Sequence, residues 1–327
     1  MRPLFSLIVP TRGRPAQLRR MLDSVARTAS HPERIEVVLV VDDDDPASLA
    51  THPRLAVRHV VVAPGRTMGA LNNAGFAASA GDYVMLLNDD VIVRTPGWDA
   101  IALRCFGRFP DPFALVHVND TLMRDHLCTF PLTSRAFYEL AGEVCSAEYE
   151  RYRIDDHIED VFNLLVVLGE RRVVYLPDVV FEHDNATQHP EAGAVYLSDP
   201  VILAADAPRF DALLPRRKEL AWRVCAAIGA RPDPSRVAAF GAVTDSFAIR
   251  SPGRQIAIRS PWWRGPLDAV RRVLGTVNRA RRKSAGELLR AIRKRLPVVR
   301  PLRDRSSEAG HGVAGPQPVL TPRERPG

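Results

Sequence analysis

The chain has 327 residues, 46% of them hydrophobic, which suffices for one large folded domain and an appendage. Its four cysteines lie far apart without a C-x-x-C pair, and no apolar run reaches the roughly 18 to 20 residues of a spanning helix. This argues against a disulfide framework, a zinc site and an integral membrane protein, and it predicts a cytoplasmic setting. The net charge is +7, yet residues 264–305 hold 14 basic and 3 acidic side chains, so the basicity belongs to the C-terminal tail.

Strand and helix patterns alternate through the N-terminal third of the chain. Aliphatic and β-branched runs predict strands, and Pro15 followed by an apolar stripe at i, i+3, i+4 and i+7 predicts the first helix. Such alternation implies right-handed crossovers and a mostly parallel central sheet flanked by helices. We therefore expect an α/β fold with strands at 4–9, 35–41, 56–62 and 83–87, and a helix at 67–80 closed by Gly81.

The second half of the chain has a less regular pattern. We expect a strand at 115–119, a helix at 134–141, a buried helix at 161–168, and strands at 173–176 and 179–183. Prolines, glycines and arginines accumulate beyond residue 229. The predicted parts are a main domain at 1–228, a basic amphipathic helical extension at 229–296 and a disordered tail at 297–327.

Two acidic clusters follow strands of the predicted sheet, at Asp42–Asp45 and Asn88–Asp90. Ligands of open α/β sheets bind beyond the carboxyl ends of the strands, so we expect both clusters to face one crevice. Asp90 is the preferred ligand for Mg²⁺ or Mn²⁺, with Asn88 and Asp89 shaping the site, because these cations favour carboxylate and phosphate oxygens. The alternative is that Asn-Asp-Asp only makes a turn.

The first acidic cluster also has two interpretations. Asp42 or Asp43 accepts hydrogen bonds from the base or ribose of a nucleotide, or the run is merely an acidic transition from strand to loop. Four like charges in a row repel one another, and a bound cation or ligand donors would offset that repulsion. We therefore favour a functional role for Asp42 or Asp43.

Four carboxylates precede the apolar helix predicted at 161–168, namely Asp155, Asp156, Glu159 and Asp160. Transfer to a hydroxyl acceptor requires a general base, and a positioned carboxylate suits that role. At a helix N-terminus the same side chains would also complement the helix dipole without any catalytic role. Both interpretations stay open for each of the four.

His183 ends the last predicted strand, within Phe181–Asp184. Its imidazole is suited to completing the coordination of a metal or to contacting phosphates. The alternative is an ordinary surface or core histidine, which is the commoner case for a lone histidine.

In their order and spacing, these segments resemble the inverting glycosyltransferases of family 2, which have a GT-A fold. The resemblance runs from about Ser6 to about Asp211. It rests on Ser6–Arg12, the aspartates after the second strand, Leu71–Gly75, Ala80–Val84, Leu86–Asp90, Glu159–Asp160, Tyr175–Asp178 and Glu182–His183.

The resemblance implies a role for each matching residue. Asn88–Asp90 would stand at the D-x-D metal motif of the family, with His183 as a late metal or phosphate contact. Asp160 would be the base, with Glu159 and Asp156 as alternatives. The nucleotide pocket would be lined by Pro10, Thr11, Arg12, Asp42, Asp43 and Asn72.

The chain departs from the family pattern at two positions. Asn88 replaces the first carboxylate of D-x-D, which places most of the metal binding on Asp90. Phe162 occupies the position of the third acidic residue in the commoner E-D-x-D form. The base therefore stays open among Asp156, Glu159 and Asp160.

A protein of this family would move a sugar from a UDP-, GDP- or dTDP-sugar to the hydroxyl of a glycan or lipid-linked acceptor, with Mn²⁺ or Mg²⁺ as cofactor. The alternative function is a non-catalytic GT-A-like protein that binds a nucleotide or a glycan. Neither a glycine-rich phosphate loop nor G-x-G-x-x-G follows the first strand, which argues against a nucleotidyltransferase and a dehydrogenase.

The basic tail raises the question of a nucleic acid or membrane partner. It lacks interleaved aromatic residues after Trp262 and Trp263, which argues against nucleic acid. An arginine-rich amphipathic segment favours peripheral contact with the inner face of a membrane. A solvated basic helix is the alternative.

Overall fold

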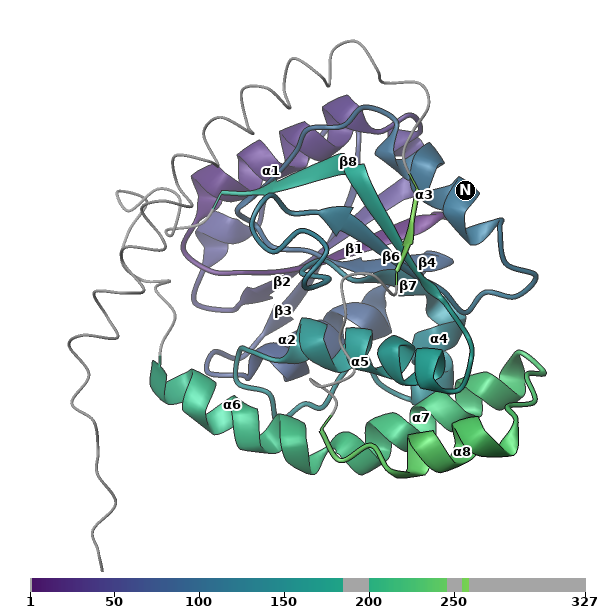
Figure 1. Cartoon of the computed structure of the whole chain (residues 1–327). Coiled ribbons are helices and arrows are strands. Elements are labelled where there is room, and N and C mark those ends of the chain that lie inside the picture. Colours follow the sequence, from purple (N-terminus) through teal and green to yellow (C-terminus); the bar gives the residue numbers. More distant parts are fainter. Residues whose placement is uncertain (1, 185–199, 246–254, 259–327) are drawn as a thin grey trace, which may run out of the picture. The chain divides into compact units, whose positions relative to one another are not determined.

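The computed structural model describes residues 2–184, 200–245 and 255–258 (Figure 1). The described helices are α1 (Pro15–Thr28), α2 (Met68–Ala78), α3 (Trp98–Phe106), α4 (Arg135–Ala141), α5 (Ile154–Val167), α6 (Pro200–Ala212), α7 (Leu214–Ala227) and α8 (Pro234–Gly241), with short 3-10 turns η1 (Pro32–Arg34) and η2 (Pro46–Ser48). The described strands are β1 (Phe5–Thr11), β2 (Ile35–Asp42), β3 (Ala56–Val62), β4 (Tyr83–Leu86), β5 (Val91–Val93), β6 (Leu115–Asn119), β7 (Leu132–Ser134), β8 (Val173–His183) and β9 (Ile256–Ala257).

These strands form one sheet in the order β3-β2-β1-β4-β7-β6-β8-β5, with β9 paired to β8. The first four strands of this order are parallel to one another, and β6 is parallel to β8. The short strand β7 is antiparallel to both β4 and β6, and β5 is antiparallel to β8. The sheet is therefore mixed but mostly parallel, which confirms the predicted α/β class.

Helices cover both faces of the sheet, with α1 and α3 on one face and α2, α4 and α5 on the other (Figure 1). The alternation of side chains along a strand explains the two layers. In β1, Phe5, Leu7 and Val9 belong to the core that includes α1 and α3, whereas Ile8 belongs to the core that includes α5. The strands β1 and β2 are buried along almost their whole length because both faces of the sheet are covered there, whereas β3 is half-exposed.

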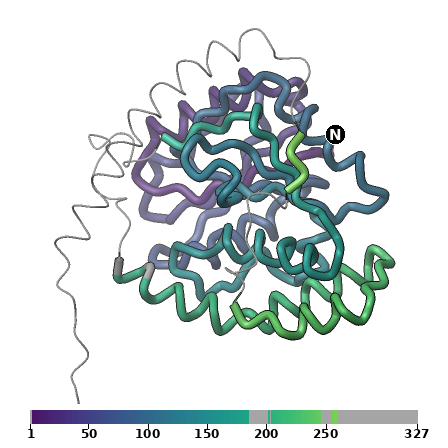
Figure 2. Tube along the Cα trace, viewed as in Figure 1, coloured from purple at the N-terminus to yellow at the C-terminus, as the bar shows by residue number. Residues whose placement is uncertain are grey.

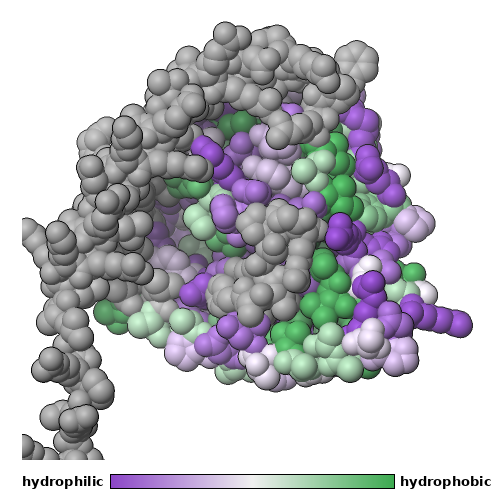
Figure 3. Space-filling view, viewed as in Figure 1, coloured by the Kyte–Doolittle hydropathy of each residue, from purple (hydrophilic) through white to green (hydrophobic). Residues whose placement is uncertain are grey.

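The helices α6, α7 and α8 form an outer layer beyond α5, which the Cα trace shows in green (Figure 2). Helix α7 packs on α4 and α5, and α8 packs on α5. Val224 and Phe240 are buried there, whereas Trp222 is 37% exposed. The same edge mixes hydrophilic and apolar residues in the space-filling view (Figure 3). Helix α8 lies beyond residue 228, and the domain boundary predicted there stays a prediction.

Several predicted boundaries agree closely with the structure. Strands 56–62 and 115–119 are observed as predicted, and Thr67 and Ser134 are the N-caps of α2 and α4. Helix α2 ends at Ala78, so Gly81 is not its cap. Gly81 is instead required because a Cβ there would collide with Ser6 of β1. The two strands predicted at 173–176 and 179–183 are one strand with an irregular register.

The helices were less well predicted in the second half. Helix α5 begins at Ile154, whereas the prediction placed its start at Val161. Helices α3, α6 and α7 were not predicted. The amphipathic helices predicted between 267 and 296, and the disorder predicted from 297 onward, lie outside the described residues.

Within the described residues, no helix combines the length and the apolar character needed to cross a bilayer. All four cysteines are buried and none forms a disulfide.

His117 on β6 gives the fold a predictable pH dependence. The side chain is fully buried beside the ring of Tyr175, and burial lowers the pKa of the imidazole to about 4. An unfolded histidine titrates near 6.5, so between these values the unfolded state binds more protons than the folded state. We expect His117 to lower the free energy of unfolding by about 1.4 kcal/mol for each pH unit of acidification in this window. Urea unfolding at pH 7, 6 and 5 measures this slope.

The variant His117→Leu should reduce that slope. His157, whose pKa burial lowers to about 3, should leave a residual slope of the same sign. The matched control is His126→Leu, on an exposed side chain. Equal slopes for His117→Leu and the unaltered chain would contradict the prediction.

Candidate functional site

A cavity of about 320 Å³ lies beyond the carboxyl ends of β1 and β4. Its walls come from five parts of the chain: the β1 and β4 ends, the start of α2, the segment before β7, the segment leading into α5, and the end of β8. The lining residues are Pro10, Arg14, Met68, Asn72, Leu86, Leu87, Asn88, Asp89, Asp90, Thr129, Pro131, Arg151, Tyr152, Ile154, Asp155 and His183.

Asp89 is the most deeply buried polar residue of this lining, with no exposed surface. The Oγ1 hydroxyl of Thr11 donates to its Oδ2 over 2.7 Å, and Arg14 forms an ion pair with its Oδ1. Burial raises the pKa of Asp89 to about 6, against the opposing charge of Arg14. The carboxylate of Asp89 is thus held by the last residue of β1 and by Arg14 of the turn after it.

Asp90 has contacts on both of its carboxylate oxygens. Arg14 Nη1 lies 3.0 Å from Oδ2, and His183 Nε2 lies 3.3 Å from Oδ1. Burial alone would raise the pKa of Asp90, but His183 and Arg14 hold it below its usual range. The same His183 nitrogen lies 3.2 Å from Asn88 Nδ2. The predicted convergence of Asn88, Asp90 and His183 is therefore observed.

The side chains of Asn88, Asp90 and His183 suit a divalent cation only when a bound diphosphate supplies further oxygen ligands. In the part of the chain that the structure describes, no three His, Cys, Asp or Glu side chains are grouped to hold a metal. Asp90 and His183 would supply one oxygen and one nitrogen. A site of one or two protein ligands completed by phosphate oxygens and water is the usual one for Mg²⁺, so these residues fit a cation that binds with a diphosphate.

The predicted nucleotide contacts divide into two groups. Pro10 and Asn72 line the cavity. Arg12 instead pairs with Asp42 at 2.5 Å and with Asp44 at 2.6 Å, on the exposed edge of the sheet. Asp42 does not line the cavity, nor does the exposed Asp43.

The predicted base residues lie away from the cavity lining. Asp160 is fully buried and accepts a 2.6 Å hydrogen bond from Arg217 Nε. Glu159 accepts from the backbone N–H of Cys128 over 2.9 Å, and Asp156 accepts from Arg153 over 3.1 Å. These contacts give all three structural partners, whereas Asp155 is the carboxylate of α5 that lines the cavity.

Helical geometry explains this difference from the prediction. At about 100° per residue, Asp160 points about 140° away from Asp155 around the axis of α5, toward α7. The helix begins at Ile154, just after Arg153 with a φ of 69°, so Asp155 lies in its first turn. The apolar series Ile154, Ile158, Val161 and Leu165 at helical spacing was the signal that could have revealed this start.

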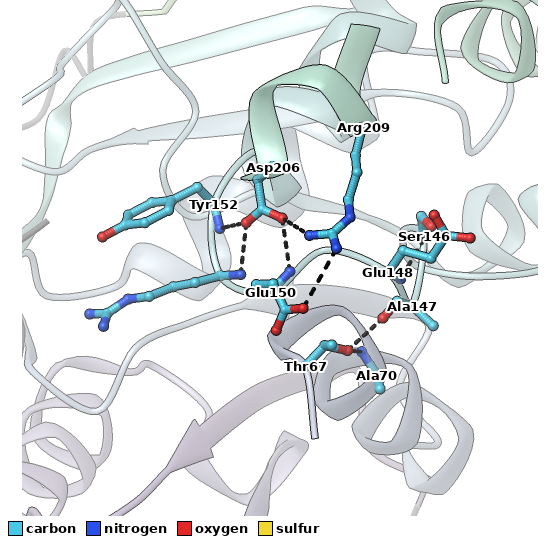
Figure 4. Close-up of polar contacts among 10 residues, drawn as sticks. Thr67, Ala70, Ser146, Ala147, Glu148, Glu150, Tyr152, Asp206 and Arg209 are labelled. Atoms are coloured by element: carbon cyan, nitrogen blue, oxygen red, sulfur yellow. Dashed lines mark hydrogen bonds and ion pairs between the residues drawn. The ribbon is translucent and has the colours of Figure 1, made fainter. Parts of the chain in front are cut away.

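The segment that carries Arg151 and Tyr152 into the cavity is held by a carboxylate of α6 (Figure 4). Asp206 is fully buried and accepts from the backbone N–H groups of Glu150, Arg151 and Tyr152 over 2.8 to 3.0 Å. Arg209, one turn further along α6, pairs with Asp206 at 3.1 Å. Three consecutive amides thus converge on one side chain.

The other side of this segment is held by the start of α2. The backbone N–H groups of Met68 and Gly69 donate to the carbonyls of Glu150 and Tyr149 over 2.9 and 3.0 Å. A Cβ at Gly69 would collide with the carbonyl oxygen of Ser146, so glycine permits the close approach. The Thr67 hydroxyl donates to Ala147 over 2.5 Å (Figure 4).

We predict that Asp206→Ala loosens this wall of the cavity. Three buried amides would lose a charged acceptor, which we expect to reduce the free energy of unfolding by roughly 3 kcal/mol. Hydrogen exchange of the amides of residues 150–152 should accelerate more than that of β1. Asp206→Asn keeps one acceptor oxygen and should have a smaller effect, and Asp211→Ala on the same helix is the matched control. Unchanged hydrogen exchange at residues 150–152 in Asp206→Ala would contradict the role of Asp206 in holding this segment.

Residues 6–103 match the family model described as Glycosyl transferase family 2. Over this segment the chain is similar to that family. The matched segment contains the turn after β1 and Asn88–Asp90. It therefore includes Arg14, Asp89 and Asp90 of the cavity. No curated protein matches the chain.

Solved structures similar to the chain include a mannosyltransferase and S. aureus TarS, each in complex with a nucleotide-sugar. The mannosyltransferase PcManGT from Pyrobaculum calidifontis, in complex with GDP-Man and Mn²⁺, is 20% identical over 78% of this chain and 83% of that one, with a TM-score of 0.46. S. aureus TarS 1-349, in complex with UDP-GlcNAc, is 14% identical over 75% of this chain and 71% of that one, with a TM-score of 0.46. A longer S. aureus TarS structure is 15% identical with a TM-score of 0.42, and the match covers 54% of this chain but only 36% of TarS.

Proposed function

We propose that this protein is a family 2 glycosyltransferase, that it transfers a sugar from a nucleotide-sugar to an acceptor hydroxyl with inversion, and that it needs Mn²⁺ or Mg²⁺. The observation that supports this most is the convergence of Arg14, Asp89, Asp90 and His183 on one cavity at the carboxyl edge of the sheet. A diphosphate and a cation require this combination of positive and negative groups in one place.

The donor would lie with its diphosphate beside Asp90 and His183, which would hold the cation. The cation would neutralise charge on the departing nucleoside diphosphate. Pro10, Asn72 and Asn88 line the same cavity and are proposed donor contacts. Thr11 acts through Asp89, to which it donates a hydrogen bond. We propose that the nucleoside contacts Arg12, Asp42 and Asp43, which lie at the carboxyl ends of β1 and β2.

We assign the base to Asp155 in place of Asp156, Glu159 and Asp160. Asp155 lines the cavity, whereas the other three bind elsewhere in the protein. The acceptor oxygen forms a bond to the anomeric carbon, the bond from that carbon to the diphosphate oxygen breaks, and Asp155 receives the acceptor proton. A single displacement of this kind inverts the anomeric carbon.

Two substitutions separate binding from transfer. Asp155→Asn should reduce transfer by at least about 100-fold, the lower range for loss of a general base, while donor affinity changes little. Asp90→Asn should weaken metal-dependent binding of the donor. Calorimetry of donor binding, together with turnover of a mass-tagged donor and NMR of the product anomer, measures these effects. A thermal-shift screen of UDP, GDP and dTDP sugars with Mn²⁺ would first select the donor.

Asp160→Asn is the matched control for the base. We expect it to destabilise the fold by about 3–5 kcal/mol, because Arg217 would lose its buried partner. Any Asp160→Asn protein that remains folded should still transfer sugar. If Asp155→Asn transfers sugar at the full rate, or if folded Asp160→Asn loses transfer, the assignment of the base to Asp155 is wrong and the base is one of the other carboxylates of α5.

A donor-binding protein without catalysis is the second candidate. Donor binding with Mn²⁺ but no turnover with any tested acceptor or with water would favour this second candidate. If the protein does transfer sugar, a product that retains the anomeric configuration of the donor would exclude the proposed inversion.

We further propose that the basic tail contacts anionic lipid and brings the enzyme to a lipid-linked acceptor. Its excess of positive charge between residues 264 and 305 supports this proposal. Full-length protein should sediment with vesicles containing phosphatidylglycerol, and a chain ending at residue 258 should not. Binding should weaken as salt rises from about 0.1 to 0.5 M. Equal sedimentation of the two forms would contradict this.

A further inference from the structure

Arg14 occupies an unusual position for a residue of a metal-dependent site. Its guanidinium contacts Asp89 Oδ1 through Nη2 and Asp90 Oδ2 through Nη1, the latter at 3.0 Å. The side chain is 18% exposed. A fixed positive charge thus lies against Asp90, which is proposed to bind the cation, and against the neighbouring Asp89.

The backbone fixes this arrangement. Gly13 has a φ of 68°, and its N–H donates to Asp45 over 2.7 Å. Arg14 follows as the N-cap of α1, with Pro15 at the first helical position. The turn therefore directs Arg14 to the end of β4.

This contact has a consequence for cation binding. A divalent ion at Asp90 must compete with the guanidinium for the carboxylate and must also tolerate a like charge nearby. A diphosphate removes this conflict, because its oxygens can bind the cation and also accept hydrogen bonds from Arg14.

We propose that Arg14 is a positioning residue that couples the two ligands. Without a donor it pairs with Asp89 and Asp90 and weakens the binding of free cation. With a donor it turns to the diphosphate and leaves Asp90 to the cation. The inference rests on the proposed function and extends it to the order of binding, in which cation and diphosphate enter together.

Coupling between two ligands is reciprocal, so each should strengthen the binding of the other by the same factor. Typical coupling amounts to about 5- to 150-fold. We expect Mn²⁺ affinity of the unaltered protein to rise within this range when a saturating nucleoside diphosphate is present. The probe is UDP or GDP, whichever gives the larger thermal shift.

The test is calorimetry of Mn²⁺ with and without that nucleoside diphosphate, on Arg14→Met. This variant keeps the length of the side chain but removes its charge. Free Mn²⁺ should bind about 10-fold more tightly, the nucleoside diphosphate alone more weakly, and the coupling factor should fall to the part that direct bonds between phosphate oxygens and the cation supply. Arg14→Lys should recover part of the coupling. Arg94→Met is the matched control, because Arg94 pairs with Glu182 outside the cavity lining.

A double variant keeps the test valid if Arg14→Met does not fold. Arg14→Met with Asp89→Asn removes both members of the buried ion pair and retains an acceptor for Thr11. It should show the same reduced coupling. Coupling equal to that of the unaltered protein in either variant overturns the inference. Failure of the unaltered protein to bind Mn²⁺ with any nucleoside diphosphate overturns the proposed function instead.

Discussion

The pairing of Arg14 with two adjacent carboxylates is the interaction on which the cavity depends. Asp89 is fully buried at the end of β4, and a buried carboxylate without a partner is strongly destabilising. Arg14 supplies the opposite charge and Thr11 a hydrogen bond, both from the end of β1 and the turn after it. The same charges that stabilise the junction of β1, β4 and α1 therefore make the cavity suitable for a diphosphate with its cation.

Strand pairing explains how distant residues reach this cavity. β1 is parallel to both β2 and β4, so their carboxyl ends emerge at one edge of the sheet. His183 arrives from the other half of the chain by antiparallel pairing, in which Val91 of β5 is opposite His183 of β8. Asp90 directly precedes Val91. The proximity of Asp90 and His183, the pair proposed to bind the metal, thus follows from the register of β5 and β8.

The parts of the fold with a strong apolar period were predictable, and the site was predictable where it follows strands. β3 and β6 have the predicted bounds, and Asn88–Asp90 line the cavity. Helix α5 was placed too late because acidic residues interrupt its apolar series, so the sequence did not indicate that Asp155 lies in the first turn of α5 and lines the cavity. Arg14 was missed because a contact between residues 76 positions apart has no local pattern.

The start of α2 explains why side chains must supply the positive charge of the cavity. A helix N-terminus often binds phosphate through its unpaired N–H groups. Here the N–H groups of Met68 and Gly69 bind carbonyls of residues 149 and 150, and Asp206 binds the next three amides of that segment. These backbone donors are thereby used to fix the wall that carries Arg151. In the proposed donor complex, Arg14 and Arg151 supply positive side chains for the diphosphate beside the cation, so the position of Arg14 affects how the donor binds.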